Sequence, residues 1–275
     1  RLRRMRAVSF KALGLIVCVA VWGAACQSDS PSAPSDDPVA ARAVVNRLQD
    51  RIRLQVSKEP ERPEVNPLDS AVPAHAALNQ EEWAEISAAG DAFEARFSLP
   101  VRGTMKPAGV KLPVFADAPF EVRDPETAVS VEAKLKGAVR APGVVSDGFL
   151  VYRDVMNGAS LVQQPILEGS EDYLWLEKAV PNDELVYEVT LGRNVAGLRH
   201  VSNTIEFLDA GGAPRLRVNA PYLVDARGNV HEVTLALRGC AADESTAMPW
   251  GRPVTPPGAT HCEIVLRWEG ISWWN

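Results

Sequence analysis

The sequence is poor in the side chains from which metal sites and nucleophilic active sites are built. It has four histidines and four cysteines in 275 residues, and no Gly-x-Ser-x-Gly elbow, His-Glu-x-x-His helix, phosphate-binding loop or EF-hand calcium loop occurs in it. Adjacent strand residues point to opposite faces, so His231 and Glu232 make a poor pair of metal ligands. A zinc site would need His200, His231 and His261 to meet through the tertiary structure. We therefore expect no enzymatic activity, no metal and no cofactor.

Two aspartates follow apolar, strand-like runs and deserve separate consideration. Asp209 and Asp225 each precede a glycine-containing segment that favours a hairpin turn. Paired carboxylates serve acid–base chemistry and sugar binding in some proteins. Aspartates at hairpin corners more often accept hydrogen bonds from their own backbone. We interpret both residues as turn residues.

Basic residues are also scarce beyond the N-terminus. Removing residues 1–25 takes away five of the 29 basic residues and none of the 35 acidic ones, which leaves 24 against 35 and a net charge of −11. Nucleic-acid binding needs clusters of Lys and Arg, so this charge excludes nucleic acid as an expected partner. It also disfavours electrostatic adsorption to anionic lipids. Membrane attachment would therefore have to come from acyl chains, of which two suffice for stable anchoring.

A long apolar run occurs at the N-terminus. Four arginines in residues 1–6 precede the run Leu13–Trp22, which has the length of a signal-peptide core and is shorter than a membrane-spanning helix; Met5 is the expected start of the chain. Gly23, Ala24 and Ala25 stand directly before Cys26, and this pattern resembles the bacterial lipobox. The resemblance implies cleavage between Ala25 and Cys26 and diacylation of Cys26, although Gly23 stands where a leucine is usual. The alternatives are an ordinary secretory signal cut after Ala25, or an uncleaved anchor.

The segment behind Cys26 is polar and rich in proline and serine up to Asp37, which is typical of a flexible tether. Gln27 stands where an inner-membrane retention signal often has aspartate. The sequence therefore predicts an outer-membrane or cell-surface lipoprotein, with a periplasmic or secreted protein as the alternative. Of the four cysteines, Cys240 and Cys262 remain as a pair, and export favours a disulfide between them over two buried thiols or metal ligands.

Two amphipathic helices are expected within residues 38–100. Asp37 suits the N-cap and Pro38 the first helical position, and apolar residues then recur at helical spacing from Ala41 to Val56, up to a stop before Pro60. A second Pro-rich connector covers 59–73. Asn79 with Glu82 resembles a capping box, and Trp83, Ile86, Phe93 and Phe97 fall on one helical face that also carries Gly90.

Residues 101–275 change to the period of two that is typical of strands. Expected strands cover Val110–Phe115, Val129–Leu135, Gly148–Arg153, Leu161–Leu167, Tyr173–Glu177, Leu185–Leu191, Thr204–Leu208, Pro214–Val218, Tyr222–Val224, Val230–Leu237 and Cys262–Trp268. The sequence thus predicts a mainly β protein. One or more antiparallel, sandwich-like domains (101–275) follow two helices (38–100), a disordered tether (26–37) and a signal peptide (1–25).

The segment between Cys240 and Cys262 is too rich in proline for regular structure and is expected to be a long loop fixed at both ends. It carries Trp250 close to Arg252. A lone tryptophan in such a loop more often packs down as a small core of its own; the alternative is an exposed platform for a ligand.

Residues 186–268 resemble a β-rich module near the N-terminus of very large secreted or surface proteins of Gram-negative bacteria, where it precedes kelch-, FG-GAP- or RHS-like repeats. The resemblance is carried by the turn around Asp209-Ala210-Gly211, the element Ala220–Gly228 and the cysteines that flank Pro249–Pro253. It implies no catalytic residues. Such modules continue into repeats, whereas this sequence stops after Trp273-Trp274-Asn275. We therefore expect either a frame cut short or a tail that packs on a missing neighbour.

Together these features favour a non-enzymatic surface lipoprotein whose β-domain is an anchor, spacer or adhesion module. Its partners would be the bilayer, reached through Cys26, and a surface polysaccharide or protein. The alternative is a secreted carbohydrate- or peptide-binding domain that uses Trp250 and Arg252. A hydrolase with a cleft carboxylate pair is less favoured.

Overall fold

A computed structural model describes residues 11–18, 36–58, 83–97, 106–156, 158–178 and 183–269. Ala25, Cys26, most of the tether, the Pro-rich connector and the C-terminal residues 270–275 lie outside these ranges. The predictions made for them stay predictions.

The described chain is mainly β, as predicted, and most of its strands pair antiparallel in two sheets. In order across the first sheet lie β12 (Gly197–Val201), β13 (Thr204–Leu208), β14 (Pro214–Val218), β1 (Lys11–Cys18), β10 (Gly169–Leu176), β9 (Ala159–Ile166), β8 (Phe149–Met156) and β7 (Gly143–Ser146), and the hairpin β15 (Tyr222–Val224) and β16 (Val230–Glu232) joins it through β1. The second sheet runs β17 (Thr234–Arg238), β18 (His261–Arg267), β11 (Glu184–Leu191), β6 (Ser130–Leu135), β5 (Phe120–Arg123), β4 (Gly109–Pro113), β3 (Ala92–Arg96) and β2 (Glu85–Ala89).

The two sheets share one apolar core. Strand alternation sends every second residue inward: Leu185, Tyr187 and Val189 on β11 meet residues such as Leu216 and Val218 from β14. Trp268, just after β18, is also buried in this core.

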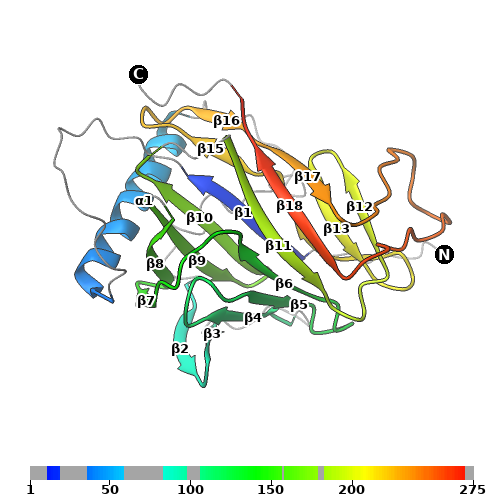
Figure 1. Cartoon of the computed structure of the whole chain (residues 1–275), viewed down its shortest axis with the longest axis horizontal. Coiled ribbons are helices and arrows are strands. Elements are labelled where there is room, and N and C mark those ends of the chain that lie inside the picture. Colours follow the sequence, from blue (N-terminus) through cyan, green and yellow to red (C-terminus); the bar gives the residue numbers. More distant parts are fainter. Residues whose placement is uncertain are drawn as a thin grey trace, which may run out of the picture.

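A helix, α1 (Pro38–Lys58), covers the outer face of the first sheet beside β7 and β8 (Figure 1). It begins as predicted, because the Asp37 carboxylate accepts a hydrogen bond from the Val39 N–H at 2.9 Å. The apolar face of α1 is buried against Phe149, Tyr173 and Trp175 in a second apolar cluster, separate from the core between the sheets. This face consists of four residues of the predicted stripe, Ala41, Val45, Leu48 and Ile52, and of Val44, which the prediction did not include. In the described part of the chain no helix is both long and apolar enough to cross a membrane.

The second predicted helix is wrong. Residues 85–96 form the hairpin β2–β3, in which Ala88 pairs with Phe93. Gly90 has a φ of +66°, a left-handed conformation that suits glycine, and with Asp91 it makes the turn between the strands. The apparent helical face is divided between two cores, because Phe93 packs toward the core between the sheets while Trp83 packs edge-to-face on Phe149, with ring centroids 5.4 Å apart.

The strands predicted by alternation are present, with ends that differ from the predicted ones by at most four residues. The predicted strand Val230–Leu237 divides into β16 and β17, which join different sheets. The strands β5, β7 and β12 were missed. Residues Lys11–Cys18, predicted as part of a signal peptide, form the strand β1, which pairs in parallel with β10, β14 and β15.

Candidate ligand-binding groove

A groove of about 540 Å³ lies between the strands β12–β14 and the long loop that connects β17 to β18. The loop contributes Pro249–Thr255, which include Trp250 and Arg252. The sheet contributes Arg199 on β12, Glu206 on β13 and the turn that precedes β14.

The loop is held against the sheet at both of its ends. The predicted disulfide is present: Cys240 and Cys262 are bonded, with their Cα atoms 5.4 Å apart. Beyond it, Asp243 pairs with β12 as an isolated parallel bridge to Arg199, and its carbonyl oxygen accepts a hydrogen bond from the His200 N–H at 2.9 Å. One wall of the groove is therefore a loop closed by a disulfide. Asp243 of this loop pairs with the edge strand β12 and adds one residue to the sheet.

The middle of the loop packs tightly on β12 because Gly197 has no side chain. A Cβ atom added at Gly197 would lie 2.3 Å from the Cγ1 atom of Val254 and 2.6 Å from the carbonyl oxygen of Thr255. Any larger residue at this position would displace the loop, so this glycine sets the position of the Trp250 side of the groove.

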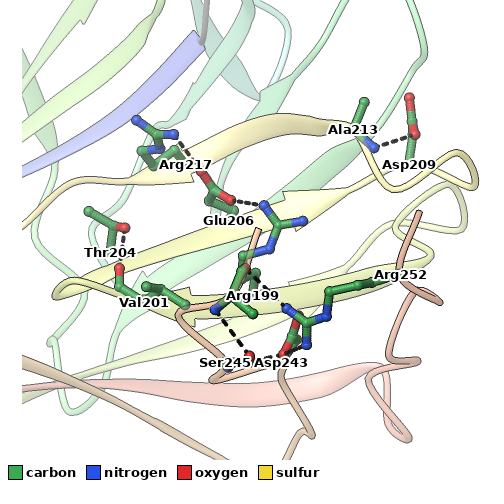
Figure 2. A network of polar contacts seen from close by, with 11 residues as sticks. Arg199, Val201, Thr204, Glu206, Asp209, Ala213, Arg217, Asp243, Ser245 and Arg252 are labelled. Atoms are coloured by element: carbon green, nitrogen blue, oxygen red, sulfur yellow. Dashed lines mark hydrogen bonds and ion pairs between the residues drawn. The ribbon is translucent and has the colours of Figure 1, made fainter. Parts of the chain in front are cut away.

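Charged side chains in the floor of the groove and next to it form two groups (Figure 2). The Arg199 Nη1 atom lies 2.9 Å from a carboxylate oxygen of Glu206, and Arg217 pairs with the other oxygen. The Arg252 Nη2 atom lies 2.7 Å from the Oδ1 atom of Asp243. Arg199, Glu206 and Asp243 are largely buried, with 14%, 11% and 13% of their side chains exposed.

The groove itself is lined by two guanidinium groups, those of Arg199 and Arg252, and by two carboxylates, those of Glu206 and Asp243. The backbone N–H of Ser245, 3.1 Å from the carboxylate, and the guanidinium of Arg252 hold the pKa of Asp243 below its ordinary value. Asp243 therefore stays ionised at neutral pH and keeps Arg252 in place.

Trp250 is 77% exposed, so the expectation that it packs down into a small core is wrong. It lies in a turn in which the Arg252 N–H donates to the Pro249 carbonyl oxygen at 3.3 Å, and Gly251 has a φ of +74°. This turn directs the indole outward at the rim of the groove. An exposed indole beside a groove that also carries charged side chains offers a ligand both a stacking surface and polar contacts.

A second hollow, of about 580 Å³, lies on the outer face of the second sheet. Its charges pair between neighbouring strands: Lys134 on β6 lies 3.1 Å from Glu188 on β11, and Arg238 on β17 lies 3.8 Å from Glu263 on β18. Cross-strand pairs of this kind are usual on a solvated sheet face. None of the described residues that line this hollow is Phe, Tyr or Trp, so the groove beside Trp250 is the better candidate site.

Two buried carboxyl groups stand apart from both hollows. Glu171 and Asp172 are adjacent on β10 and point to opposite faces of the first sheet. Burial raises the pKa of Glu171 to about 8, opposed by the hydrogen bond from the Tyr173 hydroxyl, and raises that of Asp172 to about 7. The Gln163 side-chain amide donates to Asp172 at 3.2 Å. Both carboxyls are enclosed, so we assign them to the interior and not to a substrate site.

The sequence did not point to this pair. The available signal was the polar run Ser170–Asp172 inside an apolar strand, opposite the polar pair Gln163–Gln164.

The remaining predicted polar positions have structural partners. Asp209 and Asp225 are turn residues, as predicted: the Asp209 carboxylate accepts from the Gly211 N–H at 2.9 Å, and that of Asp225 from the Asn229 N–H at 2.8 Å. The Nε2 atom of His231 lies 3.1 Å from the same Asp225 carboxylate. Among the residues that the structure describes, no group of three or more His, Cys, Asp or Glu side chains is arranged to hold a metal ion.

Comparisons with protein-family models, with curated proteins and with solved structures found no match for this chain.

Proposed function

We propose that the protein is a non-enzymatic, exported lipoprotein that binds a carbohydrate in the groove beside Trp250. The observation that carries the proposal is the exposed indole of Trp250 at the rim of a groove whose floor is formed by paired arginine and acidic side chains. Sugars bind by stacking one face on an aromatic ring while their hydroxyls bond to planar side chains, and this groove offers both kinds of contact.

The polar side chains of the floor favour a sugar, because arginine and carboxylate groups hydrogen-bond to hydroxyls. A peptide would use the indole but has fewer hydroxyls for these contacts, so a peptide is the second candidate.

The first test replaces Trp250 with alanine. We expect binding of oligosaccharides to weaken by about tenfold or more, since loss of an aromatic platform removes roughly 1.5 kcal/mol. The matched control is Met248→Ala, because Met248 is 71% exposed in the same loop and does not line the groove. Calorimetric titration measures both variants. Equal affinity of the Trp250→Ala and parent proteins for every acidic and neutral glycan tried would refute this site.

The anchoring part of the proposal rests on the lipobox-like residues Gly23–Cys26 and on the polar segment behind them. It places the protein at the outer membrane or cell surface, where the β-rich part acts as an adhesion or spacer module. The likeness of residues 186–268 to modules of large surface proteins supports the same placement.

The second test replaces Cys26 with serine. We expect the variant to lose acyl labelling and retention in the membrane fraction, because the two acyl chains on this cysteine supply the binding energy. Cys18→Ser is the matched control: it changes a cysteine of the same N-terminal segment and should be labelled and retained like the parent. Persistent acyl labelling of the Cys26→Ser protein would show that the anchor lies elsewhere.

A further inference from the structure

The strand β1 bridges two halves of the first sheet. Its first part, Lys11–Leu13, pairs with β14 at Leu216–Val218, and its middle, Gly14–Ile16, pairs with β10 at Glu171–Tyr173. Its end, Val17–Cys18, pairs with β15.

Within the described chain, no other strand connects the two halves. The neighbours of β10 are β9 and β1, those of β14 are β13 and β1, and β15 pairs with β1 and β16. In Figure 1, β1 lies in the middle of the molecule beside β10. Without β1 the sheet would have an open position, one strand wide, between β10 and β14. We call this position the strand slot.

Both faces of the strand slot are covered by apolar layers. On one side lies the cluster beneath α1, to which Tyr173 and Val224 belong. On the other side lies the core between the sheets, to which Leu174, Leu216 and Leu223 belong. Strands buried on both faces are mostly apolar, and the sequence Ala12–Cys18 carries no charged or polar side chain other than the thiol of Cys18.

The segment that fills the slot is also the apolar part of the proposed signal peptide. Under the proposed function, cleavage before Cys26 removes it, so this inference rests on that part of the proposal. The mature chain would then have two facing strand edges, on β10 and on β14, whose backbone N–H and C=O groups lack their partner. Such paired edges inside an apolar layer are a template for an incoming strand.

We infer that the strand slot of the mature protein binds an extended, uncharged apolar segment of a partner protein, parallel to β10 and β14. The chain's own residues 11–18 show the register that such a segment takes, with its central residues opposite Glu171, Asp172 and Tyr173. The partner segment would complete the sheet as β1 does. This binding position is separate from the groove beside Trp250.

The test uses the mature protein isolated from membranes, with its N-terminus determined by mass spectrometry. A labelled synthetic peptide with the sequence of residues 11–18 is titrated into it and followed by fluorescence anisotropy. We expect saturable binding. A peptide with Leu13→Pro and Leu15→Pro should bind about tenfold more weakly or not at all, since proline cannot donate to a strand ladder. These control peptides leave the protein itself unchanged.

A second control is the Cys26→Ser protein, shown by its mass to retain residues 11–18. Its slot is occupied from within, so it should not bind the peptide. A mature chain that starts at Cys26 and binds neither peptide, or that fills the slot by forming dimers, overturns the inference and leaves the proposed anchor and groove intact. A membrane-isolated parent chain that still carries residues 11–18 overturns both the inferred slot and the proposed cleavage.

Discussion

With β1 in the strand slot, the unfolding free energy of the protein is expected to fall as the pH rises from 5 to 8. In the double variant Glu171→Gln/Asp172→Asn, most of this pH dependence should be absent. The cause is the pair of buried carboxyls on β10. Glu171, near Glu168 and Asp172, has its pKa raised to about 8 by burial, and Asp172, with Gln163, Ser170 and Tyr187 around it, has its pKa raised to about 7.

The sign follows from proton uptake. In the unfolded chain both carboxyls have ordinary pKa values near 4 and are ionised at pH 5, whereas the folded protein keeps them protonated. Between pH 5 and pH 8 the folded state therefore binds more protons than the unfolded state. For each carboxyl, the unfolding free energy falls by about 1.4 kcal/mol per pH unit until the pH exceeds the pKa of that carboxyl in the folded protein. The total fall is on the order of 5 kcal/mol.

Urea unfolding at several pH values measures this effect in the Cys26→Ser chain, which keeps β1 in place. The amides retain acceptor oxygens for the Tyr173 hydroxyl and the Gln163 amide, so the double variant should fold. Glu132→Gln, at an exposed position on β6, is the control and should keep the parental slope. Parallel pH profiles of the parent and the double variant would show that the two carboxyls are not buried as described. In the mature chain, the unfolding free energy should fall less between pH 5 and pH 8 when the strand slot is empty than when the peptide of residues 11–18 fills it.

Loss of the Cys240–Cys262 disulfide should have the next largest effect. The double variant Cys240→Ser/Cys262→Ser is expected to unfold with a free energy about 3 kcal/mol lower, because the cross-link restricts the unfolded chain over 22 residues. The loop keeps other attachments, including the hydrogen bond from the Ala241 N–H to the Pro257 carbonyl at 2.8 Å and the pair of Arg252 with Asp243. We therefore expect a folded protein whose groove still forms at low temperature.

Denaturant titration of the parent protein, with and without a reducing agent, provides the control for this variant. Reduction should lower the stability of the parent to that of the double serine variant and should leave the variant unchanged. If the reduced parent and the variant are both as stable as the oxidised parent, the cross-link does not constrain the unfolded chain.

The parts of the fold that follow from local chemistry could be predicted. The Asp37 cap, Pro38 and a stripe of apolar residues define α1, and strict alternation defines β6 and β11. The short strands β5, β7 and β12 were missed because four or five residues carry little periodic signal. The hairpin β2–β3 was mistaken for a helix because short apolar patterns fit both periods, and the Gly90-Asp91 turn was overlooked.

The groove was predictable only in part. Trp250 and Arg252 stood out because a proline-rich loop between two cysteines carries them. The other charged residues of the groove, Arg199 and Glu206, come from an earlier hairpin, and the loop reaches them through the bridge between Arg199 and Asp243 and through its packing on Gly197. Tertiary contacts of this kind leave no mark in local periodicity. The same limit explains why Glu171 and Asp172 were not recognised as buried.

The separate apolar cluster under α1 has a mechanical consequence for an anchored protein. When the chain is held at Cys26 and the groove is pulled by a ligand, the load enters the fold at α1 and not at either sheet. The helix contacts the first sheet through its own small cluster, so it can detach while the core between the sheets stays closed. Detachment of α1 would therefore take up a sudden pull before the binding surface is strained.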